Sequence, residues 1–445
     1  MRDDHGRKQQ SSLLLILVAL LTVGDSWVYD TPGAIYTSLA AQFGSGYTSA
    51  ANRVLYSVYN WPNVVLSVLS GVLIDKWLGL RQSTMLFAGL VLAGQLVFSL
   101  AVTFRSYSLA VIGRFVYGLG GEAVRVAQST WIAKCSPPDR MSWTFGWVLG
   151  ISRIASAVNF AATPSLAEIS VLWATWFGSA LCFISWLSFV LLVRKVVLPA
   201  QPEQLSSGGT CTDLQAQLAQ VRSFPLQVKL QVAICVFYHV GVLLLYGIGS
   251  GILQAKAARF SERTPSLVAA LPLFIAVVGT PAAGITVDRC GKALWLLALA
   301  CVLLVVAHLL LISYVLGSGS VAAVVSSMTL VGASYSLATA VIWPLVPFLL
   351  PKEQLGVGNG IMTSVENLGL AVLPLVFSAV QAAPSIAGTS WLYTLPILLL
   401  VAAAVVAFAL VLYQVVIDVK FHQGRLNKPA SERTATDGRA QPIRV

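Results

Sequence analysis

Long hydrophobic runs separated by short polar segments dominate the chain. Twelve of these runs contain about 20 residues or more, which is the length that an α-helix needs to cross ~30 Å of hydrocarbon. They lie near 12–40, 52–75, 82–104, 107–131, 142–165, 170–193, 228–252, 265–287, 293–316, 320–345, 354–381 and 390–417. The runs are too continuously apolar for the alternating strands of a membrane barrel, and lipid leaves no other way to satisfy the backbone than helices. The pattern therefore predicts an all-α integral membrane protein.

The longest internal polar stretch runs from Arg194 to Lys229 and is rich in Pro and Gly. It is typical of a linker between two halves of six helices each. We therefore expect a tail at 1–11, a six-helix bundle at 12–193, a linker at 194–227, a second six-helix bundle at 228–417 and a basic tail at 418–445.

Composition and charge agree with this class. Hydrophobic residues make up 57% of the chain and charged residues 10%, against roughly 25% charged residues in soluble proteins. Lys and Arg concentrate in the segments on the side of the membrane that holds both termini, so both termini are predicted to be cytoplasmic. The net charge of +11 is then a topology signal and does not indicate nucleic-acid binding.

Enzyme chemistry is not indicated by the sequence. The six cysteines have no metal-ligand spacing, and no nucleophile–base set or cofactor loop is visible. We expect no metal and no cofactor.

Two similar turns occur at corresponding places in the two halves. Gly71 is followed by Asp75 and Lys76, and Gly284 by Asp288 and Arg289, with one extra residue before the next glycine in the first copy. Tandem membrane units of this kind usually enclose a central substrate site, which suggests a transporter. The acid of each turn can accept hydrogen bonds from a helix N-terminus or pair with a base. The candidate motif residues are Gly71, Asp75, Lys76, Arg81, Gly284, Asp288, Arg289 and Lys292, with Arg114 in the fourth run.

Ionisable residues inside the runs are costly, at least ~2.5 kcal/mol each at mid-membrane, and are functional candidates for that reason. Arg153 suits a carboxylate, because guanidinium binds it through two parallel hydrogen bonds. Glu122 suits an ammonium group, so the two together fit a zwitterion. An internal Glu122–Arg153 ion pair is the alternative. Arg125 is expected to be a gate or a snorkelling anchor, and Arg114 a structural or coupling residue.

The second half contributes fewer candidates. Glu366 could bind an amine or carry a proton, and His239 and His308 are either proton relays or hydrogen-bonded packing residues. Aromatic side chains could shape a pocket or pack in the core. The complete candidate substrate site is Glu122, Arg153, Asn159, Tyr29, Asp30, Tyr59, Trp61, Trp343, Glu366 and Asn367.

The two turns and the stretch from Arg114 to Gly120 resemble the motifs of the major facilitator superfamily. The stretches 29–32, 59–66, 113–122 and 366–371 narrow the resemblance to its lysosomal dipeptide transporters. The resemblance implies two face-to-face bundles with alternating access, and uniport of dipeptides out of an acidic lumen. It implies that Glu122 and Arg153 hold the two ends of the dipeptide.

The resemblance also implies a glycosylated single-span accessory protein and a lysosomal or similar acidic membrane. Because the chain shows no clear sorting signal, the plasma membrane stays open as a location. A proton-coupled or uniport carrier of another organic anion or amino acid stays open as a function. So does a ligand sensor that has transporter architecture but does not transport.

Overall fold

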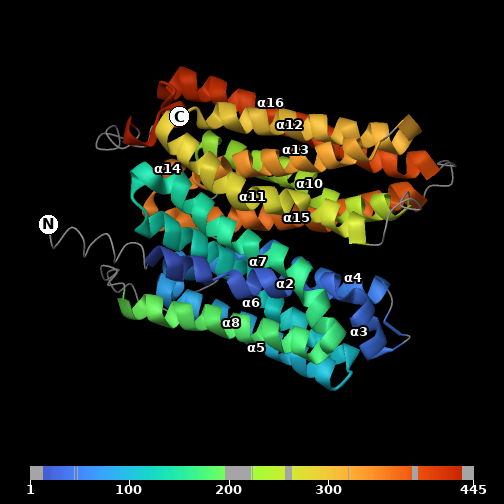
Figure 1. Cartoon of the computed structure of the whole chain (residues 1–445). Helices are drawn as coiled ribbons and strands as arrows, with labels where there is room; N and C mark the ends of the chain where they lie inside the picture. Colours follow the sequence, from blue (N-terminus) through green and yellow to red (C-terminus); the bar gives the residue numbers. More distant parts are fainter. Residues whose placement is uncertain are drawn as a thin grey trace. The chain divides into compact units, whose positions relative to one another are not determined.

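The computed structural model describes residues 14–44, 46–47, 49–195, 222, 224–255, 263–318, 320–382 and 389–432. A helix occurs in each of the twelve predicted runs (Figure 1). The first half contains α2 (Val23–Ala34), α3 (Tyr36–Phe43), α4 (Ser49–Val72), α5 (Gly79–Thr103), α6 (Tyr107–Cys135), α7 (Met141–Ile169) and α8 (Val171–Lys195). The second half contains α10 (Leu226–Ala255), α11 (Arg263–Cys290), α12 (Ala293–Ser313), α13 (Val321–Ile342), α14 (Val346–Leu349), α15 (Leu355–Ala382) and α16 (Thr389–His422).

Nine helical segments in the described part are long and apolar enough to cross a membrane. The first is Leu14–Ala34, which includes α2, and the last is Thr394–His422 within α16. Helix α6 is not among the nine, and it carries Arg114, Glu122 and Arg125 within its length. The all-helical membrane architecture that the hydrophobic runs predict is confirmed.

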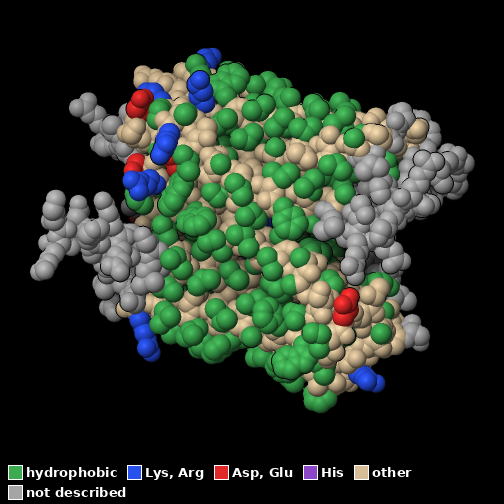
Figure 2. Space-filling view, viewed as in Figure 1, with side chains coloured by type: hydrophobic (Ala, Val, Ile, Leu, Met, Phe, Trp, Pro, Cys, Tyr) green, Lys and Arg blue, Asp and Glu red, His purple; other side chains and the backbone are tan. Residues whose placement is uncertain are grey.

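Side chains on the surface fit a lipid environment. Large apolar residues such as Val278, Trp173 and Phe104 are exposed by 73%, 67% and 69%. Figure 2 shows a face covered by hydrophobic side chains, with the visible Lys, Arg, Asp and Glu side chains at its margins. A soluble monomer rarely exposes so much contiguous apolar surface, and a bilayer requires it.

The chain forms two compact units whose borders differ from the predicted bundles. Unit 1 comprises Met1–Lys134, Ile151–Phe224 and Leu350–Ala371, and unit 2 comprises Cys135–Gly150, Pro225–Leu349 and Val372–Val445. In unit 1, α5 and α2 both pack against α8. In unit 2, α13 packs against α11 and α12, and α12 against α16. Helices α7 and α15 each contribute to both units, and the bundle borders at 12–193 and 228–417 stay a prediction.

The two repeated turns have related backbones. In the second turn, α11 ends at Cys290. The next residue, Gly291, donates its N–H to the carbonyl of Val287 and has a φ of 68°. In the first turn, a π-helical segment (η1, Leu73–Trp77) follows α4, and the N–H of Leu78 bonds five residues back to Leu73. Gly79 then has a φ of 74°. The wider π turn accommodates the extra residue of the first copy, so that both turns leave through a left-handed glycine.

Candidate functional site

A cluster of charged side chains joins helices α2 and α6 inside unit 1. Arg125 of α6 donates from Nε to Oδ2 of Asp25 on α2 at 2.8 Å. It also donates from Nη1 to Oε1 of Glu122, one turn earlier on α6, at 3.1 Å. The Asp25 side chain is 1% exposed, the Glu122 side chain 10% and the Arg125 side chain 35%. Burial weakens solvent screening, so these charges interact far more strongly than a surface pair does.

Two tyrosines complete the cluster. Tyr59 of α4 donates its hydroxyl to Oε1 of Glu122 at 2.9 Å. Tyr117 of α6 donates its hydroxyl toward Oδ1 of Asp25 at 2.7 Å and lies 2.9 Å from the Asp25 carbonyl oxygen. Both tyrosines are almost completely buried. Oε1 of Glu122 therefore has two donors, whereas Oε2 accepts no hydrogen bond within the part of the chain that the structure describes.

The guanidinium of Arg114 is held by the backbone of α2. Pro32 has no N–H, so the carbonyl of Val28, four residues earlier, lacks its helical donor. Arg114 donates from Nη1 to this carbonyl at 3.0 Å and from Nη2 to the carbonyl of Tyr29 at 3.2 Å. Its guanidinium carbon also lies 4.9 Å from the centre of the Tyr117 ring, a distance at which cation–π attraction is effective.

Arg153 lies on the unit 1 part of α7 and is half-buried. On the same face of α7, the hydroxyl of Ser156 donates to the carbonyl oxygen of Ser26 on α2 at 3.3 Å. The ion pair of Glu122 is formed with Arg125 and not with Arg153. The structure therefore does not support the alternative of a Glu122–Arg153 ion pair. It shows the guanidinium of Arg125 paired with the two acids inside unit 1, which differs from a side chain that snorkels to the membrane surface.

Asn159 continues the polar stripe of Arg153 and Ser156, and its amide bonds to two neighbours. Its Nδ2 donates to the carbonyl of Trp27 at 2.9 Å, and its Oδ1 accepts the hydroxyl of Thr163. Asn159 is 0% exposed. In this structure it joins α7 to α2.

The aromatic candidates occupy different surroundings. The Tyr29 ring lies 5.0 Å from the Tyr59 ring, and both belong to the aromatic shell around the charged cluster. Trp61, two residues after Tyr59 on α4, is 48% exposed and lies on another side of the helix. Trp343 belongs to unit 2, where its ring lies 6.3 Å from that of His239.

The candidates on α15 differ in exposure. Asn367 is buried and donates to the carbonyl of Thr363 at 2.9 Å, which is a packing contact within the helix. Glu366 is half-buried and belongs to the same unit as Glu122.

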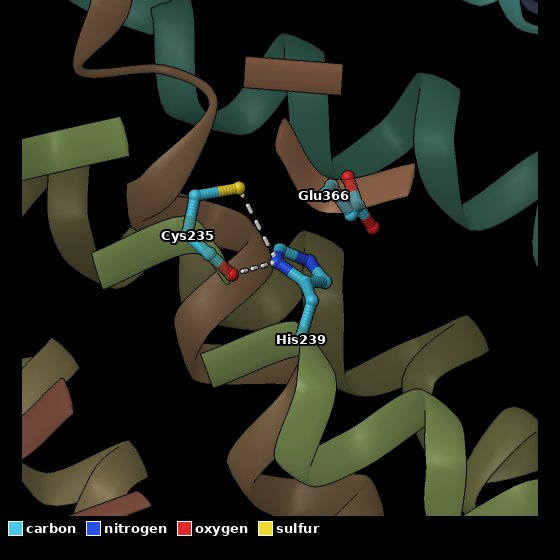
Figure 3. A group of neighbouring side chains, drawn as sticks. All are labelled: Cys235, His239 and Glu366. Atoms are coloured by element: carbon cyan, nitrogen blue, oxygen red, sulfur yellow. Dashed lines mark hydrogen bonds between the residues drawn. The ribbon is translucent and has the colours of Figure 1, made fainter. Parts of the chain in front are cut away.

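Both histidines considered as relays are buried in unit 2, within hydrogen-bonding distance of backbone carbonyl oxygens. His239 is 2% exposed, and its Nδ1 lies 2.9 Å from the carbonyl oxygen and 3.4 Å from the sulfur of Cys235, one turn earlier (Figure 3). His308 is 0% exposed, and its Nε2 lies 3.1 Å from the carbonyl oxygen of Gly241.

The acids of the two repeated turns bind the first backbone N–H groups of other helices. Asp75 accepts from the N–H of Val357, near the start of α15, at 2.8 Å. Asp288 accepts from the N–H groups of Ser142 and Trp143, at the start of α7, at 3.2 and 2.7 Å. The first N–H groups of a helix lack helical partners and carry partial positive charge, which explains why both turns have an acid here.

The glycines that begin the two motifs are explained by close backbone contact. A Cβ on Gly284 would lie 2.6 Å from the carbonyl oxygen of Ser142, and a Cβ on Gly71 would clash with the carbonyl of Gly356.

The basic residues of the two turns differ in exposure: Lys76, Arg289 and Lys292 are exposed and Arg81 is half-buried. The N–H of Lys292 donates to the carbonyl of Asn427 at 2.7 Å, which ties the segment after α16 to the second turn.

Three residues of the charged cluster were absent from the predicted site, namely Asp25, Arg125 and Tyr117. A signal for Arg125 existed in the sequence, since it lies three residues after Glu122 and therefore on the same face of the helix. Asp25 was visible as an acid inside the first apolar run. Its pairing with a residue 100 positions away depends on tertiary packing and had no local signal.

Comparisons with known proteins agree with the fold and the motifs. The chain is 31% identical over 387 residues to the lysosomal dipeptide transporter MFSD1 of Mus musculus. The aligned region covers 84% of this chain and 80% of that protein. This chain is likewise 31% identical to the MFSD1 protein of Homo sapiens over 388 residues, with the same coverage. The chain covers well over two thirds of both relatives.

Solved structures share the fold at low sequence identity. The proton:xylose symporter XylE, bound to 6-bromo-6-deoxy-D-glucose, superposes with a TM-score of 0.73 at 14% identity, over 96% of this chain and 99% of that chain. The human organic anion transporter MFSD10 superposes with a TM-score of 0.65 at 16% identity, over 91% and 99%. Residues 15–255 match the family model described as Major Facilitator Superfamily. The chain is a multi-pass membrane transporter and belongs to the Major Facilitator Superfamily.

Proposed function

We propose that the protein transports dipeptides and other short peptides by alternating access. The observation that carries the proposal is a carboxylate and a guanidinium on neighbouring parts of the sequence, α6 and α7, in the same unit of a membrane protein. Glu122 keeps Oε2 without a hydrogen-bond donor among the described residues, and Arg153 lies half-buried on α7. The names of the MFSD1 relatives support a dipeptide as the substrate.

Glu122 would bind the amino group of the peptide and Arg153 its carboxylate. Each contact is a charge-assisted hydrogen bond, about twice as strong as a neutral one. A peptide enters as a zwitterion with no net charge, so the site must compensate both ends separately. Tyr29, Tyr59 and Asp30 would contribute contacts near the amino end, and Trp61, Trp343, Glu366 and Asn367 are proposed as further lining residues. Asn159 would act by holding α7 against α2.

We further propose that transport is uniport out of an acidic lumen across a lysosomal or similar membrane, with both termini in the cytoplasm; the names of the relatives support the lysosomal location. A glycosylated single-span protein is the proposed accessory partner. The predicted bundles at 12–193 and 228–417 would be the two moving bodies, and the turns at Asp75 and Asp288 would stabilise one state by capping helices.

Uptake into proteoliposomes tests the proposal. Purified protein is reconstituted, and uptake of a labelled dipeptide is measured beside a single amino acid, a dicarboxylate and an N-acetylated dipeptide. We expect uptake of the dipeptide, competition by other dipeptides and little competition by the N-acetylated form. Preference for the dicarboxylate or the amino acid would indicate a different carrier. Thermal stabilisation by dipeptide without uptake would indicate a ligand sensor.

Variants of the two site residues sharpen the test. Arg153→Ala and Glu122→Gln should each reduce dipeptide uptake to background while the protein remains monodisperse. The matched control is Arg140→Ala, because Arg140 pairs with Asp139 at 3.7 Å and its side chain is 71% exposed. Uptake retained by Arg153→Ala would contradict the assignment of the carboxylate site.

A further inference from the structure

Asp25 is the most deeply buried charged group of the cluster, and the proposed transport step gives it no contact with the substrate. It is 0% exposed, with Arg125 on one carboxylate oxygen and Tyr117 on the other. Removing a carboxylate from water is costly even when it is paired. A fully enclosed acid at this place therefore needs a function other than direct binding.

The charges of the cluster do not balance. Arg125 is the ion-pair partner of two carboxylates, Asp25 at 2.8 Å and Glu122 at 3.1 Å. In these two ion pairs, two carboxylates share one guanidinium, so the pairs by themselves carry one negative charge in excess. The ammonium group of a peptide would balance that charge.

The geometry shows where that cation would bind. Both donors to Glu122, the Tyr59 hydroxyl and Arg125, contact Oε1, and Oε2 is left without a donor in the described part of the chain. Arg125 makes its shorter bond with Asp25. Without that competing acid, Arg125 and Glu122 would form a neutral pair, and an ammonium group would have to displace the guanidinium.

We propose that Asp25 is a positioning residue that shares Arg125 with Glu122, so that this guanidinium neutralises Glu122 only in part and Glu122 can still bind the substrate amine. This inference rests on the proposed function, in which Glu122 binds that amine. It makes Asp25 a determinant of specificity: the site selects substrates with a free ammonium group because Asp25 limits the neutralisation of Glu122 by Arg125.

The test compares the transport KM of a labelled dipeptide for three proteins. Asp25→Asn retains an oxygen that can accept the Tyr117 hydroxyl and removes the charge. We expect its KM to rise at least about 10-fold, equivalent to ~1.4 kcal/mol, and its selectivity against the N-acetylated dipeptide to fall. The double variant Asp25→Asn/Arg125→Gln removes the cation as well, which leaves Glu122 charged. Its KM should return to within about 3-fold of the wild type, less than ~0.7 kcal/mol.

Asp139→Asn is the matched control, because it makes the same change at an exposed acid paired with Arg140. A loss caused by structural damage would persist or grow in the double variant, so rescue separates positioning from folding. An unchanged KM in folded Asp25→Asn, or no rescue in the double variant, overturns the inference. If Asp25→Asn does not fold, the KM of the double variant tests the inference alone. The double variant removes both charges of the Asp25–Arg125 pair and so leaves neither of them buried without its partner. A wild type that neither transports nor binds dipeptide would overturn the proposed function itself.

Discussion

The contact between Arg114 and the kinked helix α2 permits a quantitative prediction. Replacing Arg114 by Met removes two hydrogen bonds from a guanidinium that is 1% exposed. Each such bond contributes about 1.5–3 kcal/mol, so the variant should lose roughly 3–6 kcal/mol of unfolding free energy. One part of this loss has a specific origin: the carbonyl of Val28 has no helical donor because residue 32 is Pro.

A double-mutant cycle with Pro32→Ala isolates that part. An N–H at residue 32 would supply the missing helical bond to Val28, so Arg114→Met should be less harmful in the Pro32→Ala background. The unsatisfied carbonyl costs about 1–3 kcal/mol, and the coupling free energy should have the same size. Unfolding of detergent-solubilised protein, followed by tryptophan fluorescence, measures it. Effects that add within about 0.5 kcal/mol would refute the reasoning. Arg140→Met, at an exposed site, is the control and should change stability by less than about 0.5 kcal/mol.

Two further substitutions test the turn and the cluster. Asp288→Ala removes the acceptor of the Ser142 and Trp143 N–H groups. The loss should lower the free energy of unfolding by about 0.5–2 kcal/mol and accelerate hydrogen exchange at the start of α7. Unchanged exchange there would contradict the role of Asp288 as a helix cap. Gly121→Ala places a Cβ 2.6 Å from the Tyr59 hydroxyl oxygen, so the Tyr59 side chain must move and its bond to Glu122 should weaken. Dipeptide uptake should then fall about 10-fold, the effect of ~1.4 kcal/mol; wild-type uptake by this variant would show that Tyr59 does not orient Glu122.

The hydrophobic runs were sufficient to predict the helices because lipid leaves the backbone few choices. The kind of contact that the acids of the two turns make was also predictable, since a helix N-terminus is one of the two partners expected of such an acid. Which helix each acid would bind could not be predicted. Asp75 binds α15 and Asp288 binds α7, in both cases far away in sequence, and hydropathy carries no information about such pairings.

The contacts of the central charged residues could not be predicted from the sequence. Glu122 and Arg153 were selected because they lie near the middle of their helices, but the ion-pair partner of Glu122 is Arg125. Depth along a helix does not show which side chain faces which neighbour. Asn159 illustrates the same limit: its spacing from Arg153 indicated a shared polar stripe, yet its amide bonds to the backbone of α2. A polar stripe on a membrane helix can serve either a ligand or a neighbouring helix, and only the packing distinguishes them.

The duplicated and the unduplicated charges differ in the kind of partner they have. Asp75 and Asp288 bind backbone N–H groups, which nearly every sequence provides at the start of a helix, so the same device can persist in both halves of a duplicated protein. Asp25, Glu122 and Arg125 bind one another's side chains. Each contact therefore requires a specific residue, either on another helix or one turn away on the same helix. A contact of this second kind is lost when either partner changes. The unduplicated cluster is therefore the part of the protein that can diverge with the substrate, whereas the turns are constrained by the backbone alone.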